Sequence, residues 1–145
     1  MPSTHQSIDI NAPVAEVWAK LSNFHDLSWA PNVINDCEKV GDIEGSRIGA
    51  KRVLNQAFHE TLVSIDHDKH TLKYSIDDGP SPVSANDVSN YFGVIKVMPE
   101  GDGTHVEWTS TWESDSKDAV EFCHGIYVAL LNELSASFAE ADSTA

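Results

Sequence analysis

The C-terminal stretch from Ser116 to Ala141 constrains the fold more than any other part of this chain. It contains no proline and one glycine. Its large apolar residues recur at intervals of three and four, which is the period of an amphipathic helix; they are Phe122, Ile126, Tyr127, Leu130, Leu131, Leu134 and Phe138. A helix of this length extends about 39 Å, enough to cross a small domain. The sequence therefore predicts one long helix that packs against the rest of the chain.

Most of the chain before this helix reads as short strands. The segments with strand-like patterning are Thr4–Ile10, Ile34–Val40, Ile48–Leu54, Phe58–Ile65, Thr71–Ile76, Asn90–Met98 and Thr104–Glu113. Pro13 suits the first position of a helix, and an apolar stripe follows it at Val14, Val17, Trp18 and Leu21. The partly irregular stretch around Pro31 leaves a second short helix open. We expect one curved antiparallel sheet that clasps the long helix.

Length and charge narrow the classes of protein. With 145 residues, the chain is expected to form a single domain over residues 1–145. No signal peptide or membrane span is evident, so we expect a cytoplasmic protein without membrane insertion. A net charge of −14 argues against nucleic-acid partners, because phosphates would be repelled. Cys37 and Cys123 follow no metal or redox spacing and are interpreted as reduced structural thiols.

The seven histidines invite a search for a metal site. No HxxxH or HExxH motif occurs. His67 and His70 flank a tight turn with Asp66 and Asp68, which we interpret as a solvated turn because nothing there closes a coordination shell. The sequence predicts no metal and no cofactor.

Several local motifs, in their order along the chain, match one known superfamily. They are Ile8-Asp9-Ile10-Asn11-Ala12-Pro13 with Val17-Trp18, Trp29-Ala30-Pro31, Glu60-x-Leu62, Leu72-x-Tyr74-x-Ile76, Asp78-Gly79-Pro80-x-Pro82-Val83, Tyr91, and Thr104-x-Val106-x-Trp108 before the final helix. The chain resembles the START-like, or birch-pollen-allergen-like, superfamily of helix-grip proteins. Within it, the chain is most similar to the bacterial polyketide cyclase/dehydrase and lipid-transport branch.

The resemblance implies an α+β helix-grip fold. In this fold a seven-stranded curved antiparallel sheet wraps around the long C-terminal helix, and one or two short helices follow the first strand. It also implies a deep apolar cavity that holds a small hydrophobic molecule such as a lipid, a polyketide or a hormone. We expect a monomer or a homodimer. The segment from Ser84 to Asn90 is longer than this branch leads us to expect, and in relatives it borders the cavity mouth.

Glu60 is the most informative single residue. Strand alternation places Glu60 on the same face as Phe58 and Leu62, which would bury its carboxylate among apolar groups. Desolvation raises the pKa of such a carboxyl and suits it to acid–base work. In the related abscisic-acid receptors, the glutamate of the matching motif contacts ligand through water. The alternative is a structural ion pair with Arg52 on the preceding strand, and the sequence leaves both open.

The remaining candidate site residues share the expected inner face. Tyr91 matches a cavity-facing tyrosine of those receptors and is predicted to orient a ligand oxygen or to assist Glu60 in catalysis; a core tyrosine is the alternative. Asn35 occupies the position of a ligand-facing lysine in the receptors. The other predicted ligand-binding residues are Trp29, Arg52, Leu54, Phe58, Leu62, Tyr74, Ile76, Pro82, Val83, Trp108, Phe122, Ile126 and Leu130.

Three functions remain open from the sequence. The first is a module that binds or carries a hydrophobic molecule. The second is a metal-free cyclase or dehydratase that uses Glu60 as acid or base. The third is a protein-interaction module similar to a co-chaperone, with Pro80–Val88 as the interface.

Overall fold

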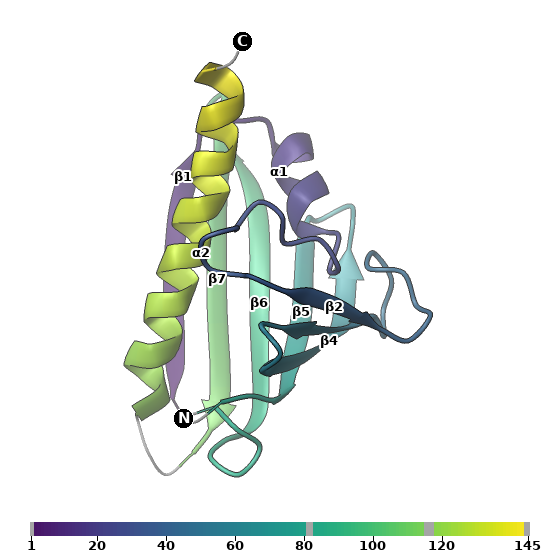
Figure 1. Ribbon diagram of the computed structural model, residues 1–145. Coiled ribbons are helices and arrows are strands. Elements are labelled where there is room, and N and C mark those ends of the chain that lie inside the picture. The colour runs from purple at the N-terminus through teal and green to yellow at the C-terminus, as the bar shows by residue number, and fades with distance from the viewer. Residues whose placement is uncertain (1, 81–82, 115–117, 144–145) are drawn as a thin grey trace.

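The structure is one curved seven-stranded sheet with a long helix against its concave side (Figure 1). The computed structural model describes residues 2–80, 83–114 and 118–143. The strands are β1 (Ser3–Ile10), β2 (Cys37–Val40), β3 (Lys51–Leu54), β4 (Phe58–Asp66), β5 (Thr71–Asp78), β6 (Ser89–Glu100) and β7 (Gly103–Glu113), and the helices are α1 (Val14–Leu21) and α2 (Asp118–Ser143). This arrangement confirms the predicted helix-grip fold.

The sheet order is β1-β7-β6-β5-β4-β3-β2, and every neighbouring pair is antiparallel. Strands β1 and β2 therefore form the two open edges. In Figure 1, α2 runs along the β1 and β7 side, while the β2 to β4 part of the sheet curls round toward the viewer. The inner face of β7 carries Val106, Trp108, Ser110 and Trp112, which are all buried.

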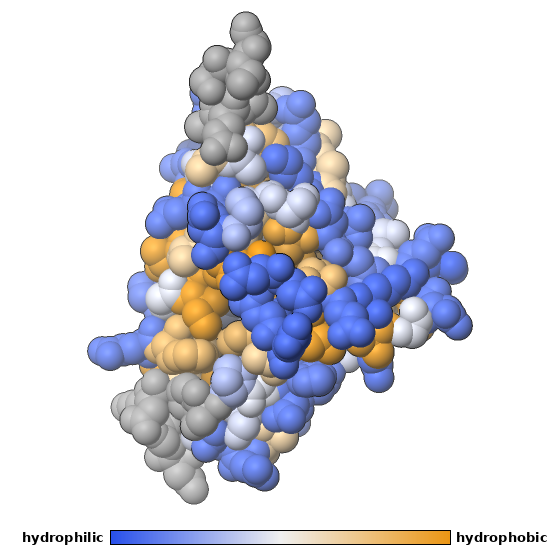
Figure 2. Space-filling view, viewed as in Figure 1, coloured by the Kyte–Doolittle hydropathy of each residue, from blue (hydrophilic) through white to orange (hydrophobic). Residues whose placement is uncertain are grey.

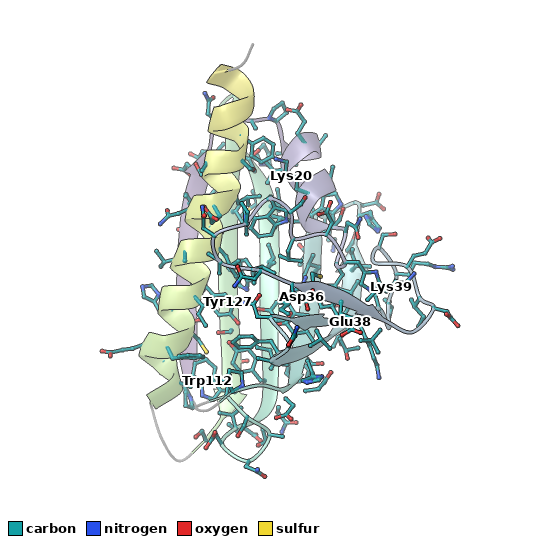
Figure 3. All side chains as sticks on the ribbon, in the orientation of Figure 1. Lys20, Asp36, Glu38, Lys39, Trp112 and Tyr127 are labelled. Atoms are coloured by element: carbon teal, nitrogen blue, oxygen red, sulfur yellow. The ribbon has the colours of Figure 1, made fainter. Side chains whose placement is uncertain are left out.

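Helix α2 carries the predicted apolar face into the core. Tyr127, Leu130, Leu131 and Leu134 are buried, and Tyr127 points from α2 toward the sheet (Figure 3). The helix extends two residues beyond the predicted end, and residues 115–117 before it lie outside the described part of the chain. No described helix is both long and apolar enough to cross a membrane.

Strands β2 and β3 begin later than their patterns predict. The amide N–H groups of Asn35 and Asp36 both donate to Oδ1 of Asn55, at 2.7 and 3.2 Å, so they are not free for a ladder. Gly49, with φ of +94°, turns the backbone just before β3. Sequence patterning did not reveal these local interactions.

The segment between Leu21 and Cys37 contains turns rather than the optional second helix. The N–H of Ala30 donates to the carbonyl of Leu27 at 3.0 Å, which closes one such turn. Pro31 then removes an N–H that a continuing helix would need. One short helix, α1, follows β1 in the described residues.

Replacing a buried residue of α2 should test how much stability the helix contact supplies. Leu134 is fully buried, so Leu134→Ala is expected to lower the free energy of unfolding by about 2–5 kcal/mol. Val128 lies on the same helix with 36% of its surface exposed. Val128→Ala should therefore change the free energy of unfolding by no more than about 0.5 kcal/mol. Urea unfolding measures both. Equal losses of stability in the two variants would contradict the observed orientation of α2.

Candidate functional site

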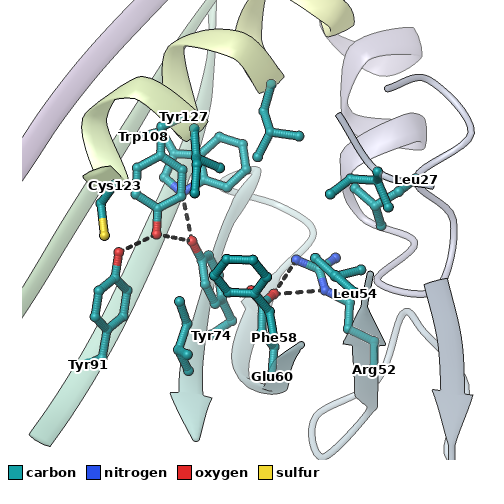
Figure 4. A pocket seen from close by; sticks show the side chains of 14 residues that line it. Leu27, Arg52, Leu54, Phe58, Glu60, Tyr74, Tyr91, Trp108, Cys123 and Tyr127 are labelled. Carbon is teal, nitrogen blue, oxygen red and sulfur yellow. Dashed lines mark hydrogen bonds and ion pairs between the residues drawn. The ribbon is translucent and has the colours of Figure 1, made fainter. Parts of the chain in front are cut away.

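A small pocket lies between the concave face of the sheet and α2 (Figure 4). Its volume is about 40 Å³. One water needs roughly 10–15 Å³ by this measure, whereas a dry cavity that takes benzene measures about 150 Å³. A hydrophobic ligand must therefore displace some of the lining side chains. Figure 2 shows apolar surface beside α2 and around the β2 to β4 region, on the face seen in Figure 1.

Most of the predicted site residues line this pocket. They are Arg52, Leu54, Phe58, Glu60, Tyr74, Ile76, Tyr91, Trp108, Ile126 and Leu130. Glu60 is buried on the inner face, as strand alternation predicted.

The other predicted residues lie elsewhere. Leu62 and Val83 are buried in the core away from the pocket, and Phe122 is half-buried against the core. Trp29 lines a smaller neighbouring pocket of about 10 Å³, and its indole N–H has no partner among the described residues. Pro82 lies outside the described part of the chain.

Asn35 does not line the pocket. It lies exposed in the loop before β2, where its backbone N–H donates to the side chain of Asn55. The position that carries a ligand-facing lysine in the receptors is thus turned outward here. No carboxylate anchor comes from this position.

Four lining residues were not predicted as site residues: Leu27, Ile34, Cys123 and Tyr127. Cys123, Ile126, Tyr127 and Leu130 follow helical spacing and share one face, so that spacing could have identified the two on α2. Leu27 and Ile34 lie in the irregular segment after α1, where no periodic pattern marks an inner face.

Arg52 and Glu60 form a buried ion pair on one side of the pocket. The register places them directly opposite each other on β3 and β4. Arg52 Nε and Nη2 both donate to Glu60 Oε1, at 2.9 and 2.6 Å, and Nη1 donates to the Phe24 carbonyl at 3.0 Å. The two side chains are only 8% and 7% exposed. The structural pair that the sequence left open is therefore present.

The pair leaves one carboxylate oxygen uncommitted. Both Arg52 bonds reach Oε1, and no described residue donates to Oε2. Burial raises the pKa of Glu60 above its usual value and outweighs the opposing effect of the Arg52 charge. Such a carboxyl can exchange a proton closer to neutral pH than an exposed one.

Three tyrosine hydroxyls meet on the other side of the pocket (Figure 4). They belong to Tyr74 on β5, Tyr91 on β6 and Tyr127 on α2, which are all the tyrosines of the chain. Trp108 Nε1 donates to the Tyr74 hydroxyl at 2.9 Å, Tyr74 donates to Tyr127 at 2.8 Å, and the Tyr127 and Tyr91 hydroxyls are 2.5 Å apart. Burial raises the pKa of each tyrosine, so all three stay protonated.

Gly93 makes room for this cluster. It pairs with Tyr74 across β5 and β6, and a Cβ on Gly93 would lie only 2.3–2.5 Å from Tyr74 ring atoms. Glycine therefore allows the Tyr74 ring to lie over the β6 backbone and to point its hydroxyl at Tyr127.

The described side chains close enough to share a metal ion lie away from the pocket. They are Asp9, Glu100 and His105, whose potential ligand atoms all fall within 4.8 Å of one another. His105 Nδ1 lies 2.6 Å from Asp9 Oδ1, and this contact raises the pKa of His105. We interpret the group as an exposed ion pair at the ends of β1, β6 and β7.

The sequence matches the family described as polyketide cyclase/dehydrase and lipid transport over residues 1–139. The chain belongs to this family, which confirms the resemblance drawn from its motifs. No curated protein matches the sequence.

Solved structures show the same architecture. A protein of Nitrosospira multiformis is 44% identical, with a TM-score of 0.92 and coverage of 94% of this chain and 96% of that one. The XoxI protein of Bacillus cereus is 25% identical, with a TM-score of 0.80 and coverage of 98% and 99%. Norcoclaurine synthase of Thalictrum flavum, solved with dopamine and hydroxybenzaldehyde, is 17% identical, with a TM-score of 0.74 and coverage of 95% and 86%. This last likeness shows the fold alone.

The raised pKa of Glu60 predicts a distinctive pH dependence of stability. A carboxyl whose pKa is higher in the folded state than in the unfolded state, where it is about 4.5, stabilises the fold at low pH, and that stability is lost as the pH rises toward the folded pKa. The stability of the wild type relative to Glu60→Gln should therefore fall as the pH rises above about 4.5. Urea unfolding across pH measures this difference. If the relative stability of the wild type rises with pH instead, the Arg52 charge lowers the pKa of Glu60 by more than burial raises it.

Proposed function

We propose that this protein binds a small hydrophobic molecule in the pocket between its sheet and α2. Family and fold indicate a ligand-binding domain of the polyketide cyclase type. The pocket walls at Leu54, Ile126 and Leu130 are apolar, as such a ligand requires. The family description includes lipid transport, and norcoclaurine synthase holds aromatic molecules on the same fold.

The polar groups in the pocket carry this proposal. Burying an ion pair costs several kcal/mol per ion before its partners repay it, and apolar residues of similar volume often serve stability equally well. The Arg52–Glu60 pair and the tyrosine cluster nevertheless border one apolar space. A few fixed polar groups in an otherwise apolar pocket are typical of sites that orient a ligand.

The segment after α1 offers a way to enlarge the pocket. Leu27 and Ile34 form part of the wall, and the segment has no helix or strand to hold it. It is tied to α2 by Asn32, whose backbone N–H and side-chain amide donate to Glu133 at 2.7 and 3.2 Å. Outward movement of this segment would admit a ligand larger than the present volume.

Catalysis by Glu60 is the second candidate function. Its uncommitted Oε2, its raised pKa and the protonated Tyr91 hydroxyl are what a proton transfer during aldol closure and water loss would use. This chemistry needs no metal. An enzyme would lose turnover in Glu60→Gln while it still binds substrate, whereas a carrier has no turnover to lose.

The loop before β6 gives less support to a protein-interaction function. Val83 and Val88 are only 1% and 8% exposed, so both are turned inward. Ser81 and Pro82 lie outside the described residues. The described part of Pro80–Val88 therefore offers little apolar surface to a protein partner.

Filling the pocket should weaken binding. Ile126 lines the pocket, and Ile126→Trp would occupy its small volume. The neutral dye N-phenyl-naphthylamine, whose fluorescence rises in apolar surroundings, should bind the wild type at one site and bind Ile126→Trp at least about tenfold more weakly. Val128→Trp, on the exposed side of the same helix, is the matched control and should bind as the wild type does.

Circular dichroism and thermal melting of both variants check that each one folds. Equal dye binding by all three proteins would place the hydrophobic site elsewhere and contradict the proposal. A dye that fails to bind the wild type would also count against the proposal.

A further inference from the structure

A second, smaller pocket of about 10 Å³ lies beside the pocket between the sheet and α2, which we call the inner pocket. The apolar residues that line the second pocket and not the inner one are Leu21, Phe24, Trp29, Leu72 and Ile95. Four of the described side chains line both pockets, namely those of Leu27, Arg52, Tyr74 and Trp108. Because the same side chains border both spaces, the two pockets are neighbours and these four residues form the partition between them.

Three side chains of the partition are held in place by hydrogen bonds. Arg52 donates to Glu60 from Nε and Nη2, at 2.9 and 2.6 Å. Trp108 Nε1 donates to the Tyr74 hydroxyl at 2.9 Å, and that hydroxyl donates to Tyr127 on α2 at 2.8 Å. Moving any of the three would break a buried hydrogen bond, which is unfavourable.

Leu27 is the exception in the partition. It belongs to the segment after α1, all of which the structure describes and which contains turns but no helix or strand. The bonds around it are local, because its carbonyl accepts the Ala30 N–H at 3.0 Å and the Asp26 carboxylate accepts the Ser28 N–H at 2.9 Å. Figure 4 shows Leu27 on the opposite side of the pocket from Tyr127. Its apolar side chain can therefore move without breaking a hydrogen bond.

The second pocket suits an apolar chain. Leu21, Leu72 and Ile95 are all buried and present hydrocarbon side chains to it. Its polar residues Asn23 and Asp26 are exposed, so an apolar chain in the pocket need not strip them of water. A hydrocarbon that passes the partition thus meets further apolar walls.

We propose that Leu27 determines the length of the ligand that this protein accepts. A short ligand ends at the Leu27 side chain inside the inner pocket. A longer ligand displaces Leu27 and extends into the second pocket as far as Trp29. This inference rests on the proposed binding function and adds the residue that sets its specificity.

Alkylbenzenes of increasing chain length test the inference on the full chain: toluene, butylbenzene and hexylbenzene. NMR titration measures their dissociation constants, and nuclear Overhauser effects show which indole ring the end of each bound chain contacts. Among the described lining residues, Trp29 lines the second pocket alone and Trp108 lines both pockets. Each further CH₂ that is buried should tighten binding about fourfold, and this gain should stop in the wild type where the chain meets Leu27.

Leu27→Ala should open the partition. The affinity for hexylbenzene relative to toluene should rise about tenfold or more over the wild-type ratio, because the chain no longer has to displace a side chain. The end of the hexyl chain should then contact the Trp29 ring. Leu130→Ala, the same substitution at a residue that lines the inner pocket alone, is the matched control and should leave Trp29 without this contact.

Leu27→Val removes a single methylene and keeps the test decisive if Leu27→Ala fails to fold by circular dichroism. It should change the affinity ratio in the same direction by a smaller factor. An unchanged ratio in the folded Leu27 variants would overturn the inference while a hydrophobic binding function stands. Contact with Trp29 as strong in Leu130→Ala as in the Leu27 variants would also overturn it. Failure of every protein to bind any of the three probes would count against the proposed function as well.

Discussion

The interior of this protein depends on the ion pair between Arg52 and Glu60. The antiparallel register of β3 and β4 places the two residues opposite each other on the inner face, where both side chains are more than nine-tenths buried. The guanidinium also lies 3.7 Å from the centre of the Phe24 ring and donates to the Phe24 carbonyl. Arg52 therefore joins the sheet to the segment after α1. Because removing either partner would strand a buried charge, the pair fixes one polar wall of the pocket.

The opposite wall depends on how α2 meets the sheet. Tyr127 brings its hydroxyl from the helix to Tyr74 on β5 and Tyr91 on β6, so the three elements meet at one polar point in an apolar layer. Gly93 permits this meeting because any side chain there would collide with the Tyr74 ring. The two polar walls rest on strands and a helix, while Leu27 and Ile34 come from an irregular segment. The scaffold thus combines fixed polar groups with a wall that is less constrained.

The sequence predicted the helices and strands better than it predicted which side chains meet in the pocket. Strand alternation correctly placed Glu60 inside, and helical spacing gave the buried face of α2, because both depend only on local periodicity. The late start of β2 and the exposure of Asn35 depend on hydrogen bonds to Asn55, twenty residues away in the chain from Asn35, which no periodic pattern encodes. The tyrosine cluster depends on the register of β5 and β6 and on the seating of α2. The sequence predicted Tyr74 and Tyr91 as pocket residues and Tyr127 only as part of the apolar face of the helix, and only the structure shows that their hydroxyls meet.

The most direct test of ligand binding is native mass spectrometry of the protein purified from its own host, followed by organic extraction and identification of what is released. The account predicts one extra mass per chain, carried by a small hydrophobic molecule, in the wild type and in Val128→Trp but not in Ile126→Trp. An empty wild-type protein that also shows no thermal shift with alcohols, phenols, sterols or fatty acids would contradict the account. An extra mass that persists in Ile126→Trp would also contradict the account, because the ligand would then lie outside the pocket.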